Sequence, residues 1–311
     1  MKILARGGLG NQLFQFCFIH EYATKYGKIE IGIIPDSSAA IDRPYELEPL
    51  LSVCSHVHLD CQNLSRKHSN FQLRFIRFRE RVLFRKFTNL IPVLDKMELH
   101  EKTPFVFSTP KRRLTKIDLP INGYFQHWQF VENVWPVVKE ELNVVLSHYS
   151  RDLKHRNLFG EKYIILHFRG GDFLTLSELF GVLSPSYYLK ALEYVKKTIP
   201  DEYRIIIATN DVKFAKKFAQ IIGVGSFEIL DSENFNSWET LALMSAAAVV
   251  ISANSTFSWW GGYLCMKNGG VCIVPETWYK TFEKESSTAL RHPEFVTIRE
   301  TFEETFSVSK A

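Results

Sequence analysis

Apolar and polar positions in the first part of the chain predict a strand, a helix and a second strand. Residues 2–5 form a short apolar run, and a glycine-rich turn follows it. Residues 11–26 then carry apolar side chains at helical spacing, and residues 29–35 are again strand-like. A strand, turn, helix and strand in this order are the opening of a parallel, doubly wound sheet.

The same alternation begins again in the second half. Residues 163–169 form a continuous apolar run that ends in polar residues, as a buried parallel strand does. Further strands are expected at 204–210, 227–230, 249–252 and 271–275, and helices at 186–198, 211–222, 240–248 and 257–268. The polar stretch 145–160 fits a linker or a helix end. We therefore expect two α/β units with a cleft between them.

Composition places the chain among ordinary globular proteins. It has 311 residues, of which 46% are apolar and 23% charged. The five cysteines are odd in number and contain no C-x-x-C pair, so buried free thiols and a reducing compartment are expected. The N-terminal apolar run is too short for a signal peptide, and no window approaches the roughly 18 apolar residues of a membrane span. These features predict a soluble, cytoplasmic protein that needs no disulfide.

Charge is unevenly distributed along the chain. Residues 66–116 hold 14 Lys or Arg and four acids, which gives +10 locally in a chain of net charge +4. An amphipathic helix with a solvated basic face is the ordinary interpretation. Peripheral contact with the anionic inner face of the cytoplasmic membrane is the functional alternative. The modest net charge does not suggest a nucleic-acid partner.

The first candidate site is the turn Gly7-Gly8-Leu9-Gly10-Asn11-Gln12. Glycines let a ligand approach the backbone, and a following helix would point bare N–H groups at an anion. A dinucleotide fingerprint is disfavoured, because its third glycine falls on Leu13 and no acid stands clearly about 20 residues further on. No Gly-Lys-Ser/Thr follows, so it is not a Walker loop. A tight structural turn without a ligand stays open.

The second candidate is His167-Phe-Arg169-Gly170-Gly171-Asp172, at the carboxyl end of the strand at 163–169. Ligands bind at this edge of open α/β sheets. Alternation places His167 and Arg169 on one side of the strand, and the planar guanidinium is suited to grip phosphate. A surface salt bridge between Arg169 and Asp172 is the structural alternative.

The third candidate, Asn254-Ser255-Thr256-Phe257-Ser-Trp-Trp-Gly-Gly262, follows another strand and opens a helix. Its small polar side chains can cap that helix, and its amides can form an anion pocket. The sequence contains no Asp-x-Asp motif, so a metal-bridged donor is not favoured, and no G-x-S-x-G supports hydrolase chemistry. Three phosphate-compatible turns on two α/β units predict a nucleotide diphosphate held in an interdomain cleft without metal.

Together these motifs resemble glycosyltransferase family 11, the α-1,2-fucosyltransferases. The similar segments are Gly7–Gln15, Asn122–Gln126, His167–Asp172, Glu239–Ser245 and Asn254–Gly261. The resemblance implies a GT-B architecture of two facing Rossmann-like domains, 1–155 on the acceptor side and 156–311 holding the donor. It also implies inverting transfer of L-fucose from GDP-β-L-fucose to the 2-hydroxyl of a galactose, with no cofactor or metal.

The resemblance also assigns roles to residues. Arg169 would hold the diphosphate, and Asp172 is the first choice of general base, followed by Glu178 and His127 near the acceptor. The donor-binding residues would be Gly8, Gly10, Asn11, His167, Arg169, Glu239, Asn254, Ser255, Thr256 and Phe257. The acceptor would be a galactose-terminated oligosaccharide or a lipid-linked glycan.

Two departures and three rival functions stay open. The family usually has a second arginine where Gly170 stands, and Thr209-Asn210-Asp211 replaces its usual Ser-Asp-Asp. A fucosyltransferase of α-1,3, α-1,6 or O-linked type is one rival, although the Asn254–Gly261 segment favours the α-1,2 class. A non-catalytic nucleotide or glycan sensor is the second, and a nicotinamide oxidoreductase is the third.

Overall fold

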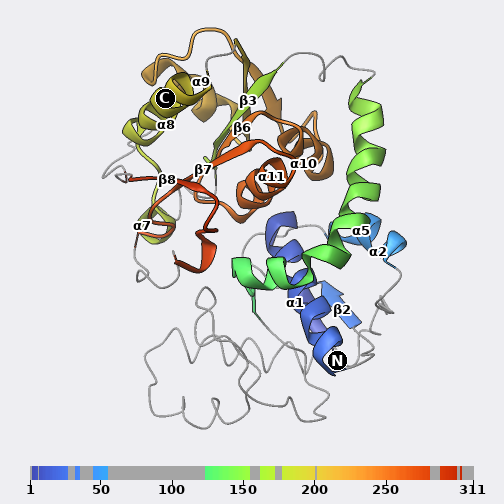
Figure 1. Cartoon of the computed structure of the whole chain (residues 1–311). Helices are drawn as coiled ribbons and strands as arrows, with labels where there is room; N and C mark the ends of the chain where they lie inside the picture. The colour runs from blue at the N-terminus through green and yellow to red at the C-terminus, as the bar shows by residue number, and fades with distance from the viewer. Residues whose placement is uncertain are drawn as a thin grey trace, which may run out of the picture. The chain divides into compact units, whose positions relative to one another are not determined.

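The computed structural model describes residues 2–5, 7–26, 32–35, 45–54, 123–154, 162–171, 177–199, 202–280, 288–299 and 302 (Figure 1). The chain divides into two compact units, Met1–Glu141 and Leu142–Ala311. Helix α5 (Trp128–Lys154) continues across this division, and the predicted boundary at 155/156 falls just after its end. The roles of the units as acceptor and donor domains, and the cleft between them, stay predictions.

The N-terminal unit begins with a parallel β-α-β element, as predicted. Strands β1 (Lys2–Ala5) and β2 (Gly32–Pro35) pair in parallel, with Lys2 opposite Gly32. Between them runs α1 (Leu9–Tyr26), which begins two residues before the predicted start. Phe14 and Phe16 of this helix are fully buried. A short helix, α2 (Glu48–Val53), follows.

Helix α5 was not predicted as an element. Its buried residues recur at helical spacing and include Val131, Val134, Val138, Leu142 and Val145. Such a stripe is how a long amphipathic helix buries one face. The helix extends to Lys154, so the polar stretch from residue 145 onward begins as a helix end, and its interpretation as a linker is wrong up to that residue.

Within its described residues, the C-terminal unit is built on a six-stranded parallel sheet of order β5-β4-β3-β6-β7-β8. The strands are β3 (Tyr163–Phe168), β4 (Arg204–Thr209), β5 (Glu228–Asp231), β6 (Val249–Ile251), β7 (Val271–Pro275) and β8 (Val296–Ile298). The helices are α7 (Ser177–Phe180), α8 (Pro185–Thr198), α9 (Val212–Ile221), α10 (Ser237–Ser245) and α11 (Thr256–Lys267). Of these, β8 and α7 were not predicted, and α10 begins three residues earlier than expected.

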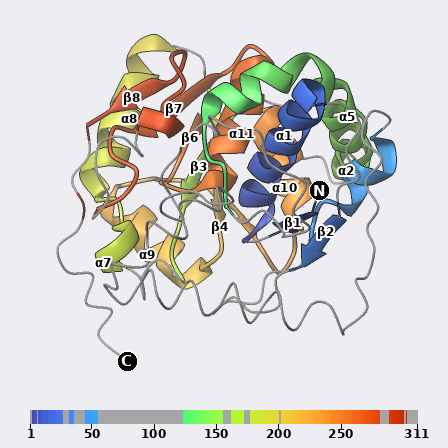
Figure 2. The same ribbon diagram turned by 90° about the horizontal axis from the view of Figure 1, so that it is seen from below.

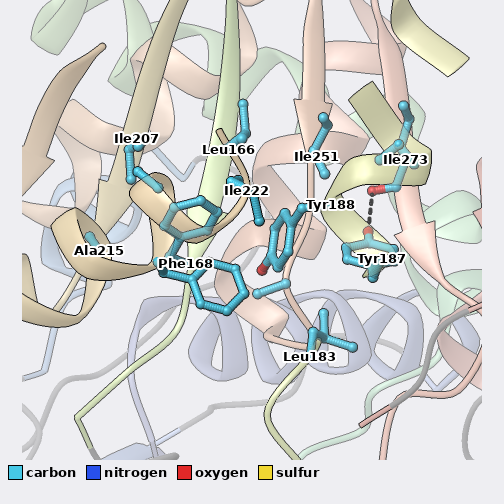
Figure 3. Close-up of a cluster of buried hydrophobic side chains, with 14 of the residues drawn as sticks. Leu166, Phe168, Leu183, Tyr187, Tyr188, Ile207, Ala215, Ile222, Ile251 and Ile273 are labelled. Atoms are coloured by element: carbon cyan, nitrogen blue, oxygen red, sulfur yellow. Dashed lines mark hydrogen bonds between the residues drawn. The ribbon is translucent and has the colours of Figure 1, made fainter. Parts of the chain in front are cut away.

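Helices cover both faces of this sheet (Figure 2). Leu166 and Phe168 of β3 point into a core shared with α8 and α9, where Tyr188 also lies (Figure 3). On the opposite face, α11 packs closely on β6 and β7, because Gly262 leaves room for Cys272. This is a doubly wound sheet, so the predicted α/β class with parallel strands is confirmed.

The strand order changes direction between β3 and β6. From β3 the chain winds outward through β4 and β5, then returns to the other side of β3 and winds outward through β6, β7 and β8. Such a reversal separates the loops that follow the two central strands, and open α/β sheets bind their ligands there. The second and third candidate motifs follow β3 and β6. The sequence predicted that each motif lies at a strand end, and the strand order brings both to the switch point of the sheet.

The structure also tests the predictions of free thiols and of a chain without a membrane-spanning helix. The described cysteines Cys17, Cys54, Cys265 and Cys272 are all free, which agrees with the prediction of free thiols. Among the helices that the structure describes, none is both long and apolar enough to cross a membrane. The basic stretch 66–116, with its predicted membrane contact, lies outside the described residues.

Candidate functional site

His167 lies near the end of β3, on the face of the sheet that α11 covers. Its ring is 6.0 Å from the ring of Phe257 in the first turn of α11, measured between centroids. The side chain is only 3% exposed, and its Nδ1 atom has no hydrogen-bond partner among the described residues. Burial, helped by the positive charge of Arg169, lowers the pKa of His167 from 6.5 to about 3. His167 is therefore a neutral imidazole at physiological pH, and its buried Nδ1 makes no hydrogen bond to a described residue.

Arg169 and the two glycines form the turn after β3. The backbone N–H of Gly170 donates to Oδ1 of Asn210, at the end of the neighbouring strand β4, over 3.2 Å. A Cβ at position 170 would lie 3.0 Å from Asp211 Cβ and equally close to the Phe214 ring. The glycine therefore lets this turn pack against the start of α9. The same crowding gives a physical reason for the absence of a second arginine.

The third motif forms the N-terminus of α11. Ser255 is the N-cap residue, but its side chain makes no capping hydrogen bond. Asn254 does not cap either: its amide donates to the carbonyl oxygens of Phe180 at 2.8 Å, Gly181 at 3.2 Å and Trp278 at 3.2 Å. The predicted side-chain cap is therefore not formed. The terminus keeps its positive dipole end without a side-chain acceptor from its own N-cap residue.

The tryptophans and glycines of this motif hold α11 in place. Trp259 and Trp260 are fully buried, and the indole N–H of Trp259 donates to the carbonyl oxygen of Leu290 over 2.6 Å. Cβ atoms at Gly261 and Gly262 would overlap Met244 and Cys272. The close packing inferred from the sequence is confirmed. These residues position α11. Thr256 and Phe257 are the first two residues of this helix.

Glu239 lies at the start of α10 and belongs to a capping box. Its carboxylate accepts from the Asn236 N–H over 2.8 Å, and the Asn236 side chain accepts from the Glu239 N–H over 2.9 Å. This reciprocal pair stabilises the first turn of α10. The cap accounts for the position of Glu239 without a ligand, and its predicted donor-binding role stays a prediction.

The first motif, in the N-terminal unit, differs from the expectation at its helix terminus. The N–H of Leu9 donates to the carboxylate of Glu46 over 2.9 Å, and the Glu46 N–H donates back to the Gln12 side chain over 2.9 Å. The amide groups at the start of α1 were expected to be bare, and for Leu9 this is wrong. A carboxylate at a helix N-terminus is itself stabilised by the dipole, and it disfavours a second anion. Gly8 lies in the turn before α1, and Gly10 is the second residue of the helix.

Asn11 connects this turn with a segment far along the chain. Its Oδ1 accepts from the Gln126 side chain over 2.9 Å, and Gln15 donates to the Gly123 carbonyl oxygen over 2.9 Å. Phe125, between them, has a positive φ of 52°, which is uncommon for a residue with a side chain. Two segments chosen from sequence, 7–15 and 122–126, therefore meet in one place.

His127 follows directly and is partly buried. Its Nδ1 accepts from the backbone N–H of Gln129 over 3.1 Å. Burial lowers the pKa of His127 below its ordinary value, against the opposing effect of the Glu21 charge. His127 is thus a neutral base beside the Asn11–Gln126 contact. Asp172 and the side chain of Glu178, the other candidate bases, lie outside the described residues.

Three residues have contacts in these sites that the sequence did not predict. Asn210 fixes the Gly170 turn, Glu46 occupies the start of α1, and the Tyr188 hydroxyl donates to the His167 carbonyl oxygen over 2.8 Å. Asn210 carried a signal, since it stands at the end of a predicted strand beside the one that bears His167. Glu46 and Tyr188 carried none, because each reaches its partner across a long sequence separation.

Comparison with known proteins gives three findings. The sequence model of a family described as "Glycosyl transferase family 11" matches residues 1–299. The O-antigen biosynthesis glycosyltransferase WbnK of Escherichia coli is 27% identical over 301 residues, which cover 91% of this chain and 96% of that protein. An alpha-1,2-colitosyltransferase of Escherichia coli is 26% identical over 296 residues, which cover 90% of this chain and 92% of that protein.

Solved structures give a weaker likeness. A glycosyl transferase family 9 protein from Veillonella parvula DSM 2008 aligns with a TM-score of 0.47 and 11% identity, over 96% of this chain and 85% of that chain. A similarity of this degree carries no argument about function. What bears on function is the family match and the geometry at the ends of β3 and β6.

Proposed function

The chain belongs to glycosyl transferase family 11, and we propose that it is an inverting galactoside α-1,2-fucosyltransferase. In this proposal the acceptor 2-hydroxyl attacks the anomeric carbon of GDP-β-L-fucose as the bond to the β-phosphate oxygen breaks. The hydroxyl proton passes to a general base, and GDP leaves. The α-1,2 linkage is favoured by the name of one relative, an alpha-1,2-colitosyltransferase. An O-antigen acceptor is favoured by the name of the other.

One observation carries the donor half of the proposal. His167 lies near the end of β3 and Arg169 directly follows it, the N-terminus of α11 follows β6, and these two strands are neighbours at the switch point of the sheet. A guanidinium and a helix dipole without a side-chain cap suit the diphosphate of a nucleotide sugar. The unpartnered Nδ1 of neutral His167 suits a hydrogen-bond donor on the nucleotide.

The proposed roles follow the charge that develops. As GDP departs, negative charge gathers on its β-phosphate oxygen while the sugar gains oxocarbenium character. Arg169 and the amides of Thr256 and Phe257 would stabilise that charge in place of a metal. Removing one such preorganised donor typically costs about 3–4 kcal/mol in the transition state. The lack of an Asp-x-Asp motif supports metal-independent transfer.

The roles of residues on the acceptor side are also proposals. We assign the general base to Asp172, with Glu178 and His127 as the alternatives, because an inverting displacement needs one proton acceptor. Gly8, Gly10 and Asn11 keep their proposed donor contacts, although the Glu46 carboxylate makes the α1 terminus a poor phosphate site. A lipid-linked acceptor and membrane contact through 66–116 fit cytoplasmic O-antigen assembly.

The first experiment is calorimetric titration of the protein with GDP-fucose, without Mg²⁺ or Mn²⁺, and with NAD as the control. We expect binding of GDP-fucose and none of NAD. A nucleotide-activated colitose belongs in the same titration, because a relative bears the name of a colitosyltransferase. Preference for that donor would correct the transferred sugar and leave the reaction class in place. Binding of NAD alone would overturn the proposal.

The linkage is tested with paired acceptors. A β-galactoside and its 2-deoxy analogue differ in the one hydroxyl that the proposal names. We expect fucose transfer to the galactoside only, with an α-linkage at its 2-position by NMR. Transfer to the 2-deoxy analogue would assign another linkage. GDP-fucose binding without transfer to any galactoside or glycan acceptor would favour the non-catalytic sensor.

A further inference from the structure

Three metal-ligating side chains meet inside the N-terminal unit. His20 lies in α1, Cys54 is the residue directly after α2, and Glu141 lies in α5. One ligand atom from each of the three lies within 4.8 Å of the others. His20 and Glu141 are buried, and Cys54 is half-buried. None of the three belongs to the motifs from which the transferase function was inferred.

The contact between His20 and Cys54 is within hydrogen-bond distance for sulfur, whereas the contact between His20 and Glu141 is long for a hydrogen bond. His20 Nε2 lies 3.7 Å from Glu141 Oε2 and 3.6 Å from Cys54 Sγ. An N–H···O hydrogen bond is typically about 2.7–3.2 Å long, so the contact with Glu141 falls outside that range. The same nitrogen faces both the sulfur and the carboxylate. A single N–H cannot be directed well at two acceptors at once.

The same distances are close to the edges of a zinc tetrahedron. Zinc–ligand bonds of about 2.3 Å to sulfur and 2.0–2.1 Å to nitrogen, at a tetrahedral angle, place the two ligand atoms about 3.6 Å apart. For nitrogen and oxygen ligands the corresponding edge is about 3.3–3.4 Å. We propose that His20, Cys54 and Glu141 bind a zinc ion.

The ligand types favour zinc over the hard cations. Calcium and magnesium take oxygen ligands, whereas a thiolate, an imidazole and a carboxylate suit zinc. A Cys54 thiolate, a neutral His20 and a Glu141 carboxylate carry two negative charges, which Zn²⁺ neutralises. A buried cluster without net charge avoids the desolvation cost that a bare buried carboxylate would carry.

Three protein ligands leave one tetrahedral position for a water molecule. The ligands come from α1, from the end of α2 and from α5, which are far apart in the sequence. An ion bound there would hold these elements together much as a disulfide does, and its binding energy would add to folding stability. The site is therefore structural in this proposal, and its test needs neither donor nor acceptor.

The test is zinc content and zinc affinity of the purified full-length chain. We expect about one tightly bound zinc per chain by mass spectrometry, and a higher melting temperature with ZnCl₂ than after chelation. Replacement by Co²⁺ should give the thiolate-to-metal charge-transfer band and the visible bands of a tetrahedral site. Loss of second-sphere partners alone typically weakens metal binding by about 10–100-fold, so Cys54→Ala should lower affinity by about 100-fold or more.

Matched variants distinguish a zinc site from a buried ion pair and from a general loss of stability. Cys265→Ala removes a buried cysteine of the other unit, whose Sγ contacts the Ala247 carbonyl oxygen at 3.1 Å, and should keep wild-type zinc affinity. Glu141→Gln retains the shape of the side chain and should lose zinc while the circular dichroism spectrum persists. Wild-type protein without zinc, or Cys54→Ala with wild-type affinity, would overturn the proposal. Glu141→Gln that is destabilised but binds zinc normally would instead identify a His20–Glu141 ion pair.

Discussion

Helices α1 and α11 both begin directly after a parallel strand and a turn of small residues, yet their N-termini differ in charge. At α1 the Leu9 N–H donates to the Glu46 carboxylate. At α11 the N-cap residue Ser255 makes no side-chain hydrogen bond to the first turn. The dipole of α1 is therefore already compensated by an acid, whereas neither the N-cap residue nor the first turn of α11 supplies one.

This difference teaches that a strand, a turn and a helix do not by themselves define an anion site. Both turns are glycine- or serine-rich, and either could bind phosphate by pattern alone. At α1 the carboxylate of Glu46, 37 positions from Leu9 in the sequence, already accepts the hydrogen bond that a phosphate would need. At the end of β3, the neighbour of β6, lie positive Arg169 and neutral His167, and for this reason our proposal places the diphosphate on the α11 side.

The largest effect on the transfer rate should come from removing the positive charge of Arg169. We expect Arg169→Ala to lower the transfer rate by about two to three orders of magnitude, or about 3–4 kcal/mol, because the departing phosphate loses its guanidinium. Arg204→Ala is the matched control, since Arg204 pairs with Glu228 over 3.0 Å at the opposite end of β4. It should change the rate by about twofold or less. Turnover of Arg169→Ala near the wild-type rate would contradict the assignment.

The next largest effect is on the pH dependence of stability, and it should come from replacing the buried His167. Its pKa is lowered to about 3 in the folded protein, so the unfolded chain binds the additional proton as the pH falls below about 6.5. The free energy of unfolding should then fall by about 2 kcal/mol between pH 7 and 5 from this group. Urea unfolding of His167→Gln should lack that part of the pH dependence.

The control for this prediction is the exposed His148. His148→Gln should keep the wild-type dependence of unfolding free energy on pH. A His167→Gln variant with an unchanged slope would show that burial does not hold His167 neutral in the folded protein.

Sequence pattern predicted the C-terminal unit well because its strands are continuous apolar runs. The runs at 163–169 and 249–252 were enough to place His167, Arg169 and Ser255 at strand ends, and the structure shows that these two strands are neighbours. Asp211 was expected to open a helix, and its carboxylate does accept from the Phe214 N–H over 3.0 Å. Local periodicity and local capping suffice where the contacts are local.

The residues that sequence missed act over long separations. Glu46 reaches Leu9, and His20, Cys54 and Glu141 meet from three elements, with no spacing that resembles a zinc motif. Polar contacts of this kind depend on tertiary packing, which no short window of sequence contains. Helix α5 was not predicted for a different reason. The polar residues toward its end were interpreted as a linker or helix end, and the apolar residues at helical spacing before them were not recognised as a helix.

A smaller effect is expected from giving α11 the charge that α1 already has. Ser255→Asp places a carboxylate at the N-cap, where it should stabilise the helix and repel the diphosphate. We expect GDP affinity to fall about tenfold, or about 1.4 kcal/mol, with an equal or higher melting temperature. Ser255→Asn supplies a neutral cap of similar shape and should change affinity much less. Equal losses in both variants would point to shape and not to charge.

The smallest effect is expected from the reverse change at α1. Glu46→Gln keeps an oxygen that can accept from the Leu9 N–H but removes the charge that complements the helix dipole. Such a charge is typically worth about 0.3–1 kcal/mol, so a small loss of unfolding free energy in urea is expected. GDP affinity should stay at the wild-type value, because in our proposal the diphosphate depends on α11 and Arg169. If Glu46→Gln instead bound GDP several times more tightly, the start of α1 would also be a phosphate site that its own carboxylate weakens, and the two helix termini would differ only in degree.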